Sequence, residues 1–505
     1  MRRPAAAAAW LLAAALALSG CDWRERKATE LLDQAALEVA AGQAAQAKSQ
    51  EAAVARYEQA LVLLTKLKAD YKGTEAATRA DKPTTTVGPL QLGTLEHVVL
   101  PEARRRAEAE GGPIACAAYL AETEPRPLPR ARALAGVAAD AAAAGDTGTA
   151  KRLLGTGEAV VAGLPTGSPA RAEAMAALAE AYMAGRDLEK ARALVLANGL
   201  PDAWLALAAA HGAAGQATKA ADMIQHAPGG APRARAEALG DVAAALAKTD
   251  PVRAKALMRD AEAAARQAPP ADQPRVALAL ARSLAAQQQL LQADAWLDAQ
   301  PGLRDASLAE LAGLVAAYEA ARGGPRLLKR VHVELEAIAA GSDLAPSAEV
   351  PWLANLAYLQ ARLGEPEPGA FALARARLEA DGIDPAVGAA PGGTPVPGAA
   401  AEVEALLRVA ERAQALGQVE AAQAARADVA ARLGVVPPAG RDALRAEAAR
   451  LAALAGDGAQ VLALVGAIRD QAAAARALAR AARAADGTLV ASPEELHDLA
   501  AIFRP

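Results

Sequence analysis

Proline and glycine interrupt the middle of this chain at intervals that suit pairs of helices. The interruptions fall at 163–165, 199–201, 227–230, 268–270, 301–302 and 346. The segments between them are rich in alanine and leucine, and several are broken once more near the middle, at Gly185, Gly215, 249–251 and 287–289. Because proline and glycine end helices, this spacing predicts helical hairpins, each made of two helices and a short turn.

The composition favours helix along the whole chain. Alanine, the best helix former, is the commonest residue, and only 3% of the residues are aromatic. Residues that favour strands are sparse, so we predict an all-α protein with no sheet. Trp204, Leu207, Ala208 and His211 form one stripe at helical spacing. Stacking of neighbouring hairpins buries such stripes.

One segment matches a known repeat pattern closely. Its matching residues are Trp204, Leu207, Ala208, His211, Ala220, Ile224, Ala227 and Pro232. In this spacing the segment resembles a tetratricopeptide repeat, with His211 where that family usually has tyrosine. The preceding unit supplies Met175, Leu178, Ala179, Tyr182, Ala191 and Val195 in the same register. The resemblance implies an α-solenoid of helical hairpins, although a different helical-pair repeat remains an alternative.

The resemblance also implies where a partner would bind. In tetratricopeptide arrays the first helix of each hairpin lines the concave face. This geometry places six residues toward the groove: Glu173, Glu180, Met183, Asp202, Arg275 and Arg282. It places Trp204, Leu207, Tyr182 and His211 in packing positions. The charges would clamp an extended peptide, and the alternative is that they are simply a solvated face.

The amino terminus has the pattern of a secretion signal. Arg2 and Arg3 are followed by an uncharged run from Ala5 to Leu18 and then by small residues. This run is shorter than the roughly 20 apolar residues of a membrane span. The tetrad Leu18-Ser19-Gly20-Cys21 resembles the lipobox of bacterial lipoproteins. An ordinary secretory signal is the alternative.

The lipobox resemblance implies that residues 1–20 are removed and that Cys21 is acylated. The chain would then be held to a membrane of the cell envelope by lipid and would face the periplasm. Two or more acyl chains on one protein anchor it stably. Asp22 resembles the inner-membrane retention signal of enteric bacteria, but the choice between inner and outer membrane stays open.

The net charge narrows the classes of partner, and the position of the second cysteine indicates whether its thiol is reactive. Loss of Arg2 and Arg3 with the signal changes the formal charge from −4 to −6. This mild acidity gives no reason to expect nucleic acid. Cys116, the other cysteine, lies in an apolar run, and we expect it to be a buried, inert thiol.

No established catalytic or metal-binding motif is present in the sequence. The glycine-rich segment 145–151 is expected to be a turn between helices. His332, Glu334 and Glu336 would lie on different faces of a helix, so we expect no metal and no cofactor. Arg476, Arg480 and Arg483 share one helix face. They could meet an acidic partner or lipid headgroups, or simply be solvated.

The chain is divided as follows: signal peptide 1–20, helical hairpin 21–80, loop 81–95, repeat array 96–383, flexible Gly/Pro/Ala linker 384–400, and C-terminal helical region 401–505. Residues 492–495 read as a capping box for the last helix. The predicted function is a non-catalytic scaffold that binds a protein or peptide partner. A nutrient- or glycan-binding lipoprotein and an envelope enzyme are the alternatives.

Overall fold

The computed structural model describes residues 5–225, 230–299, 302–341, 344–383, 388–389, 395–396, 398–486 and 488–503, with backbone only for 5–22, 225, 388–389 and 395–396. The described residues are almost entirely helical, which confirms the predicted fold class at this level. They fall into two compact units, which are described separately. Unit 1 comprises residues 1–119 and 492–504, and unit 2 comprises residues 120–491.

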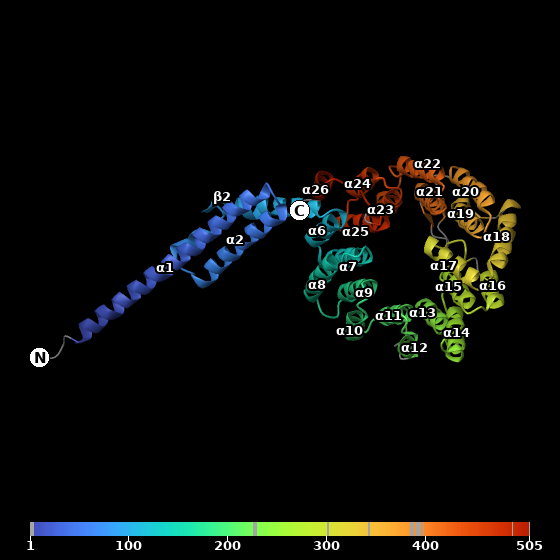
Figure 1. Cartoon of the computed structure of the whole chain (residues 1–505), viewed down its shortest axis with the longest axis horizontal. Coiled ribbons are helices and arrows are strands. Elements are labelled where there is room, and N and C mark those ends of the chain that lie inside the picture. Colours follow the sequence, from blue (N-terminus) through green and yellow to red (C-terminus); the bar gives the residue numbers. More distant parts are fainter. Residues whose placement is uncertain are drawn as a thin grey trace. The chain divides into compact units, whose positions relative to one another are not determined.

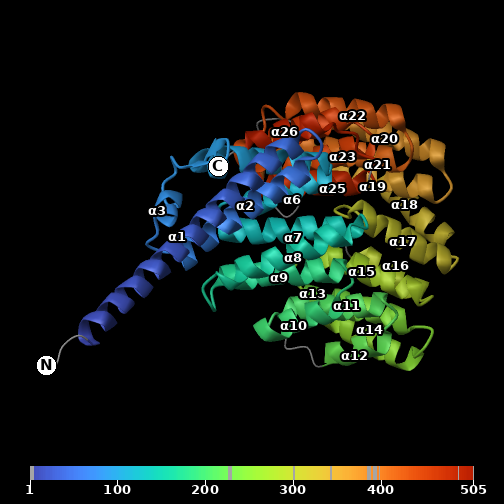
Figure 2. The same cartoon turned by 60° about the vertical axis from the view of Figure 1, so that its left-hand side comes forward.

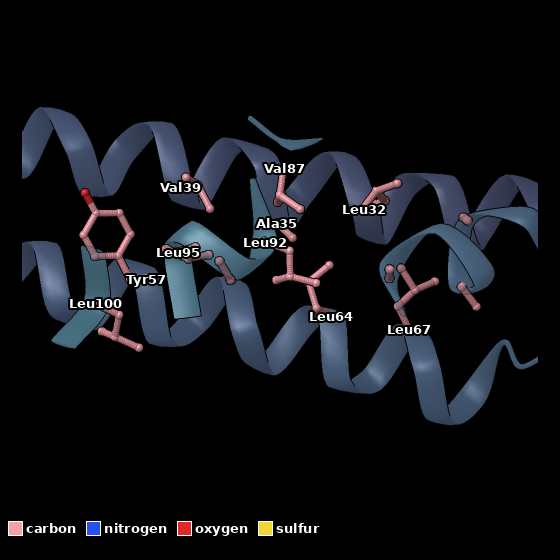
Figure 3. Close-up of a cluster of buried hydrophobic side chains, with 14 of the residues drawn as sticks. Leu32, Ala35, Val39, Tyr57, Leu64, Leu67, Val87, Leu92, Leu95 and Leu100 are labelled. Atoms are coloured by element: carbon pink, nitrogen blue, oxygen red, sulfur yellow. The ribbon is translucent and has the colours of Figure 1, made fainter. Parts of the chain in front are cut away.

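Unit 1 is built on two long antiparallel helices, α1 (Ala5–Gln46) and α2 (Gln50–Asp70). Ser49 caps α2 through its hydroxyl. The shorter elements that follow are α3 (Glu75–Ala80), α4 (Leu92–Thr94), a π-helical turn (Leu95–Val99), α5 (Leu100–Glu110), α6 (Pro113–Thr123, shared with unit 2) and α26 (Pro493–Ile502). A core of Leu32, Ala35 and Val39 from α1 and Tyr57, Leu64 and Leu67 from α2 lies between the long helices (Figure 3).

The predicted loop 81–95 contains a small antiparallel strand pair, so the expectation of no sheet was wrong in this detail. The strands are β1 (Thr86–Val87) and β2 (Leu90–Gln91). Gly88 has a φ of +61°, and a Cβ there would lie 2.7 Å from the backbone oxygen of Ala36. Glycine therefore allows the turn and the close approach to α1. Val87 and Leu92 are buried in the core of unit 1.

Unit 2 consists of successive helical hairpins. The hairpins are α7 (Pro127–Ala143) with α8 (Thr147–Ala162), α9 (Pro169–Ala184) with α10 (Leu188–Asn198), α11 (Pro201–Ala213) with α12 (Ala217–Gln225), α13 (Pro232–Leu246) with α14 (Pro251–Arg266), α15 (Gln273–Ala286) with α16 (Leu290–Ala299), α17 (Leu308–Ala320) with α18 (Gly324–Ala339), α19 (Pro346–Arg362) with α20 (Pro366–Ala380), α21 (Gly398–Ala415) with α22 (Val419–Arg432), and α23 (Pro438–Leu454) with α24 (Gly458–Gly466). Helix α25 (Gln471–Ala484) follows them. These bounds agree with the interruptions seen in the sequence.

The hairpin turns share one backbone device. In most of them a residue with positive φ stands two residues before the first residue of the second helix, as Gly145, Gly215, Gly417 and Gly456 do. Asp146, which follows Gly145, caps α8, so segment 145–151 is the expected turn between helices. Asp250 likewise caps α14 with Pro251 in its first turn.

The odd-numbered helices of unit 2 form an inner layer, and the even-numbered helices lie outside them (Figure 1). Each odd-numbered helix packs against the next one, and α25 packs against α7. Gln471 on α25 donates to the backbone oxygen of Leu120 at 2.8 Å, and Arg483 on α25 pairs with Asp140 on α7 at 2.8 Å. Unit 2 therefore closes on itself, and a second view shows the same order of hairpins (Figure 2).

The two units do not follow the predicted domain boundaries. Residues 96–119, expected in the repeat array, belong to unit 1, as does α26. Helices α21 to α25, expected in a separate C-terminal region, continue the hairpin series of unit 2. The linker at 384–400 falls mostly outside the described residues, except for the paired strands β3 (Gly388–Ala389) and β4 (Pro395–Val396) and the start of α21. No helix in the described part of the chain is long and apolar enough to cross a membrane.

Candidate functional site

The inner layer of unit 2 is the surface on which the predicted partner-binding residues lie. We define its inner face as the exposed and half-buried positions of the odd-numbered helices α7 to α25. Many of these positions are alanine, for example Ala206, Ala312 and Ala316. Between them stand charged side chains in the middle of the helices. The inner face is therefore lined mainly by small side chains, with charged side chains at separate positions among them.

Ion pairs join consecutive helices across this inner face. The pairs are Arg132–Glu173 between α7 and α9, Asp241–Arg282 between α13 and α15, Glu411–Arg450 between α21 and α23, and Arg483–Asp140 between α25 and α7. Most of these side chains remain partly exposed, and exposed ion pairs each contribute about 0–1 kcal/mol. Their main effect is to hold the charges at defined positions.

The structure separates the six predicted partner-binding residues into three groups. Glu173 and Arg282 are engaged in the ion pairs above, and Arg282 also lies across Gly313 of α17. Asp202 accepts a hydrogen bond from the backbone nitrogen of Ala231 at 2.8 Å. These three charges are therefore already satisfied within the chain.

Glu180 and Arg275 differ from the other charged candidates. Both are exposed on inner-layer helices, α9 and α15. Within the described residues neither has an ion-pair partner. Met183 is half-buried and lines a crevice instead. Glu180 and Arg275 are thus the predicted residues with charge available to a partner.

The residues that were expected to pack are buried. Trp204, Leu207, Tyr182 and His211 are all nearly inaccessible to solvent. The indole nitrogen of Trp204 donates to the backbone oxygen of Met223 at 2.8 Å. Their burial agrees with the packing positions expected for them.

Two tyrosines on inner helices use the same contact to the preceding hairpin. Tyr182 donates to Glu158 at 2.6 Å, and Tyr318 donates to Asp294 at 2.9 Å. In each pair the carboxylate stands 24 residues earlier in the chain. Burial raises the pKa of both phenols, and the carboxylates raise it further. The phenols therefore stay protonated and act as structural donors.

A crevice of about 680 Å³ lies between the α9–α10 turn and the end of α11. Its lining includes Met183, Arg186, Glu189, His211 and Gln216. Nδ1 of His211 lies 2.8 Å from Oε1 of Gln216, and Nε2 has no hydrogen-bond partner in the described part of the chain. Burial lowers the pKa of His211, so its imidazole is neutral at physiological pH. A neutral imidazole held by one bond fits a packing role.

Arg412 and Asn355 form a buried polar cluster that the sequence pattern did not reveal. Arg412 has no exposed surface, and its guanidinium donates to Oδ1 of Asn355 and to the backbone oxygen of Ala306, each at 3.0 Å. Asn355 in turn donates to the backbone oxygens of Leu303 and Ala306. Burial lowers the pKa of Arg412 to about 10. The cluster holds residues 303–306 against α19 and α21.

The residues considered for metal binding and thiol chemistry are separated from one another. Nε2 of His332 lies 2.7 Å from Glu365, whereas Glu334 accepts from the indole of Trp352 at 2.8 Å. The described residues hold no group of three or more potential metal ligands. Cys116 is buried, and burial raises the pKa of its thiol to about 12, which confirms the expected inert thiol.

The side chain of Cys21 lies outside the described residues, so the lipidation prediction has no structural counterpart here. No family model matches this chain, and no curated protein is significantly similar to it.

Proposed function

We propose that this chain is a lipid-anchored protein of the bacterial cell envelope whose unit 2 binds a protein or peptide partner. In this proposal unit 2 is a tetratricopeptide-like α-solenoid, acylated Cys21 is the membrane anchor, and no catalysis is involved. The observation that carries the proposal is the inner face itself. Stacked first helices present small residues with the unpaired charges Glu180 and Arg275 among them.

The shape and chemistry of the inner face favour a polypeptide as the partner. Alanine side chains allow a backbone to approach closely, and isolated charges select a register and a direction. Stacked hairpins commonly use their extended inner surface for binding. The proposal therefore assigns recognition to charge placement more than to apolar anchors.

The positions of the aromatic residues support a glycan partner less well than a protein or peptide partner. Tyr57, Trp204, Tyr318 and Trp352 are buried. Tyr182 lines one crevice in the described part of the chain, and its hydroxyl is bonded to Glu158. Trp23 and Phe371 are exposed, but they lie on α1 and α20, outside the inner face. Stacking on sugar rings needs accessible aromatic faces. A protein or peptide partner is therefore the function that we propose.

Charge reversal on the inner face tests the proposal. Glu180→Lys combined with Arg275→Glu should reduce the amount of partner recovered by chemical crosslinking in envelopes, and the melting temperature should change little because both side chains are exposed. Lys255→Glu with Asp260→Lys on the outer helix α14 is the matched control, since both of these residues are also exposed. Equal recovery with both double variants would count against the inner face as the binding surface.

Replacement of the cysteine tests the anchor separately. Cys21→Ala should abolish incorporation of labelled palmitate and release the chain from the membrane fraction, because a single acylated residue is the proposed attachment. Mass spectrometry of the mature amino terminus provides the readout. An unmodified terminus at another residue would refute lipidation.

A further inference from the structure

The junction at which unit 2 closes carries an excess of positive charge. Helices α25 and α7 run parallel there, since Arg476 crosses Gly136 and Arg483 pairs with Asp140 further along both helices. Arg476, Arg480 and Arg483 all lie on the one face of α25 that is not buried.

The carboxylates near this junction are already paired with other arginines, and Arg126 is shared by Asp470 and Glu124. The pairs are Arg132–Glu173 at 2.8 Å, Arg483–Asp140 at 2.8 Å and Arg126–Asp470 at 2.5 Å. In the part of the chain that the structure describes, no carboxylate lies within ion-pair distance of Arg476 or Arg480. Among these residues Arg476 and Arg480 therefore form no direct ion pair, although Asp470 attracts Arg476 and Asp140 attracts Arg480 from a greater distance.

Arg476 is held in a defined position. Its Nε donates to the backbone oxygen of Ala472 at 3.3 Å, and its stem lies so close to Gly136 that a Cβ there would be 3.1 Å from Cδ. Burial lowers the pKa of Arg476, and the positive charge of Arg132 lowers it further. An anion bound here would relieve this repulsion and compensate the desolvation of the guanidinium.

The spacing of the two arginines indicates which kind of anion fits. Arg476 and Arg480 are one helical turn apart, which is about 6 Å along the axis. Alternate side chains of an extended peptide project from the same face about 6.6 Å apart. The neighbouring positions Gly136, Ala139 and Ala473 are small, so a peptide backbone can approach closely.

We propose that Arg476 and Arg480 bind an extended acidic peptide segment through two carboxylates that stand two residues apart. This inference rests on the proposed function, because it specifies the chemistry of the partner that the inner face receives. The bound segment lies over the α25–α7 junction and neutralises it. Recognition is by charge-assisted hydrogen bonds from guanidinium to carboxylate.

Titration of the full chain with a defined peptide tests this inference. The probe is a short fluorescein-labelled peptide of alternating alanine and glutamate, followed by fluorescence anisotropy, and the same peptide with glutamine is the control ligand. We expect only the glutamate peptide to bind, and we expect Arg476→Gln and Arg480→Gln each to weaken its affinity by about fivefold or more. Arg259→Gln on the outer helix α14, where Arg259 is exposed, should leave the affinity unchanged.

Gly136→Ala provides a variant that keeps both arginines. The added Cβ displaces the stem of Arg476, so peptide affinity should fall while the melting temperature stays close to that of the unmodified chain, because the displaced group is a flexible side chain. The assigned geometry would be wrong if Gly136→Ala and Arg476→Gln, measured as two separate variants, both bound the peptide as tightly as the unmodified chain.

Two further results would overturn the choice of ligand. Inorganic phosphate competing as well as the peptide would indicate a site for a single small anion, and stronger binding to phosphatidylglycerol vesicles would indicate a membrane surface. The proposed function is tested independently. If partner recovery depends on Glu180 and Arg275 but not on Arg476 and Arg480, only this inference fails.

Discussion

Arg412 shows how one residue can organise several elements. Its guanidinium is fully buried and bonds to Asn355 on α19 and to the backbone oxygen of Ala306. A buried charge is costly unless its hydrogen bonds are complete. Here helix α19 and the segment that contains Ala306 supply those bonds to a side chain on α21, so the cluster specifies how residues 303–306 cross α19 and α21.

Removal of either partner should therefore be severe. Arg412→Met leaves the buried Oδ1 of Asn355 without its donor, and should cost about 2–5 kcal/mol of stability. The double variant Arg412→Met with Asn355→Leu should cost less than the sum of the single variants. Thermal and urea unfolding of the three variants measure this. Strict additivity would mean that the two side chains do not act as a unit.

At the scale of the element, most hairpin turns of unit 2 contain one residue in the left-handed conformation. Glycine occupies this position at Gly145, Gly215, Gly417 and other turns, whereas Arg186, Gln288 and Arg322 adopt a positive φ without being glycine. The left-handed conformation costs non-glycine residues roughly 1–2 kcal/mol. The turn geometry is thus imposed by the packing of the two helices, even where the residue is unsuited to it.

Substitutions at two turns should have opposite effects. Gln288→Gly should raise stability by up to about 1 kcal/mol, since relief of strain exceeds the added chain entropy. Gly417→Ala should lower stability by about 1 kcal/mol or more, although space for a Cβ is available there. The melting temperatures of the two variants measure these changes in stability. A more stable Gly417→Ala protein would contradict the assigned conformation.

The C-terminal helix α26 is attached to α5 by a pH-dependent contact. Ser492 and Glu495 form the predicted capping box, and Nε2 of His497 lies 2.8 Å from Glu102. Burial alone would raise the pKa of Glu102, but hydrogen bonds from Arg105 and Arg106 and the charge of His497 bring it down to about 2. The folded unit therefore favours the ionised carboxylate.

Acid should weaken unit 1 for this reason. The pKa of Glu102 is lower in the folded state than its ordinary value of 4.5, so its contribution to stability is present above that value and is lost as the pH falls toward 2. Glu102→Gln should show a smaller fall in melting temperature over the same pH range. Calorimetry between pH 6 and acid conditions measures this. Parallel pH profiles for both proteins would exclude Glu102 as the titrating group.

At the scale of the whole chain, closure of unit 2 depends on contacts between its first and last helices. Asp140 is mostly buried, and this burial raises the pKa of its carboxyl although Arg483 and Arg480 oppose the shift. Arg483 supplies the ion pair at 2.8 Å. The junction therefore contains a carboxylate that relies on a cation from the other end of the unit.

Loss of Arg483 should leave Asp140 buried without its counter-charge. Arg483→Gln should destabilise unit 2 at neutral pH more than Asp140→Asn does, because the latter leaves no buried charge. A carboxyl with a raised pKa contributes stability below that pKa and loses it as the pH rises. The Arg483→Gln protein should therefore regain melting temperature on moderate acidification. A deficit that is the same at neutral and mildly acidic pH would argue against this account.

Local features of the sequence were sufficient to locate many of the helices in both units. Proline and glycine act within a few residues of the helix ends that they define, and Asp250-Pro251 and Ser492–Glu495 cap helices in the way that their side chains predict. The apolar stripe around Trp204 and Leu207 likewise required only helical spacing to be assigned to the interior. Cys116 was correctly expected to be buried because it lies in an apolar run.

Only the tertiary structure decided which helices belong together and which charges are free. Asp470 and Arg126 are 344 positions apart yet form an ion pair, and no local pattern predicts that α25 returns to α7 or that α26 joins unit 1. The same holds for Glu173 and Arg282, whose partners stand on neighbouring inner helices. Helix formation in this chain depends on backbone preferences over one or two turns, whereas closure and charge pairing depend on the summed geometry of every hairpin between the two groups.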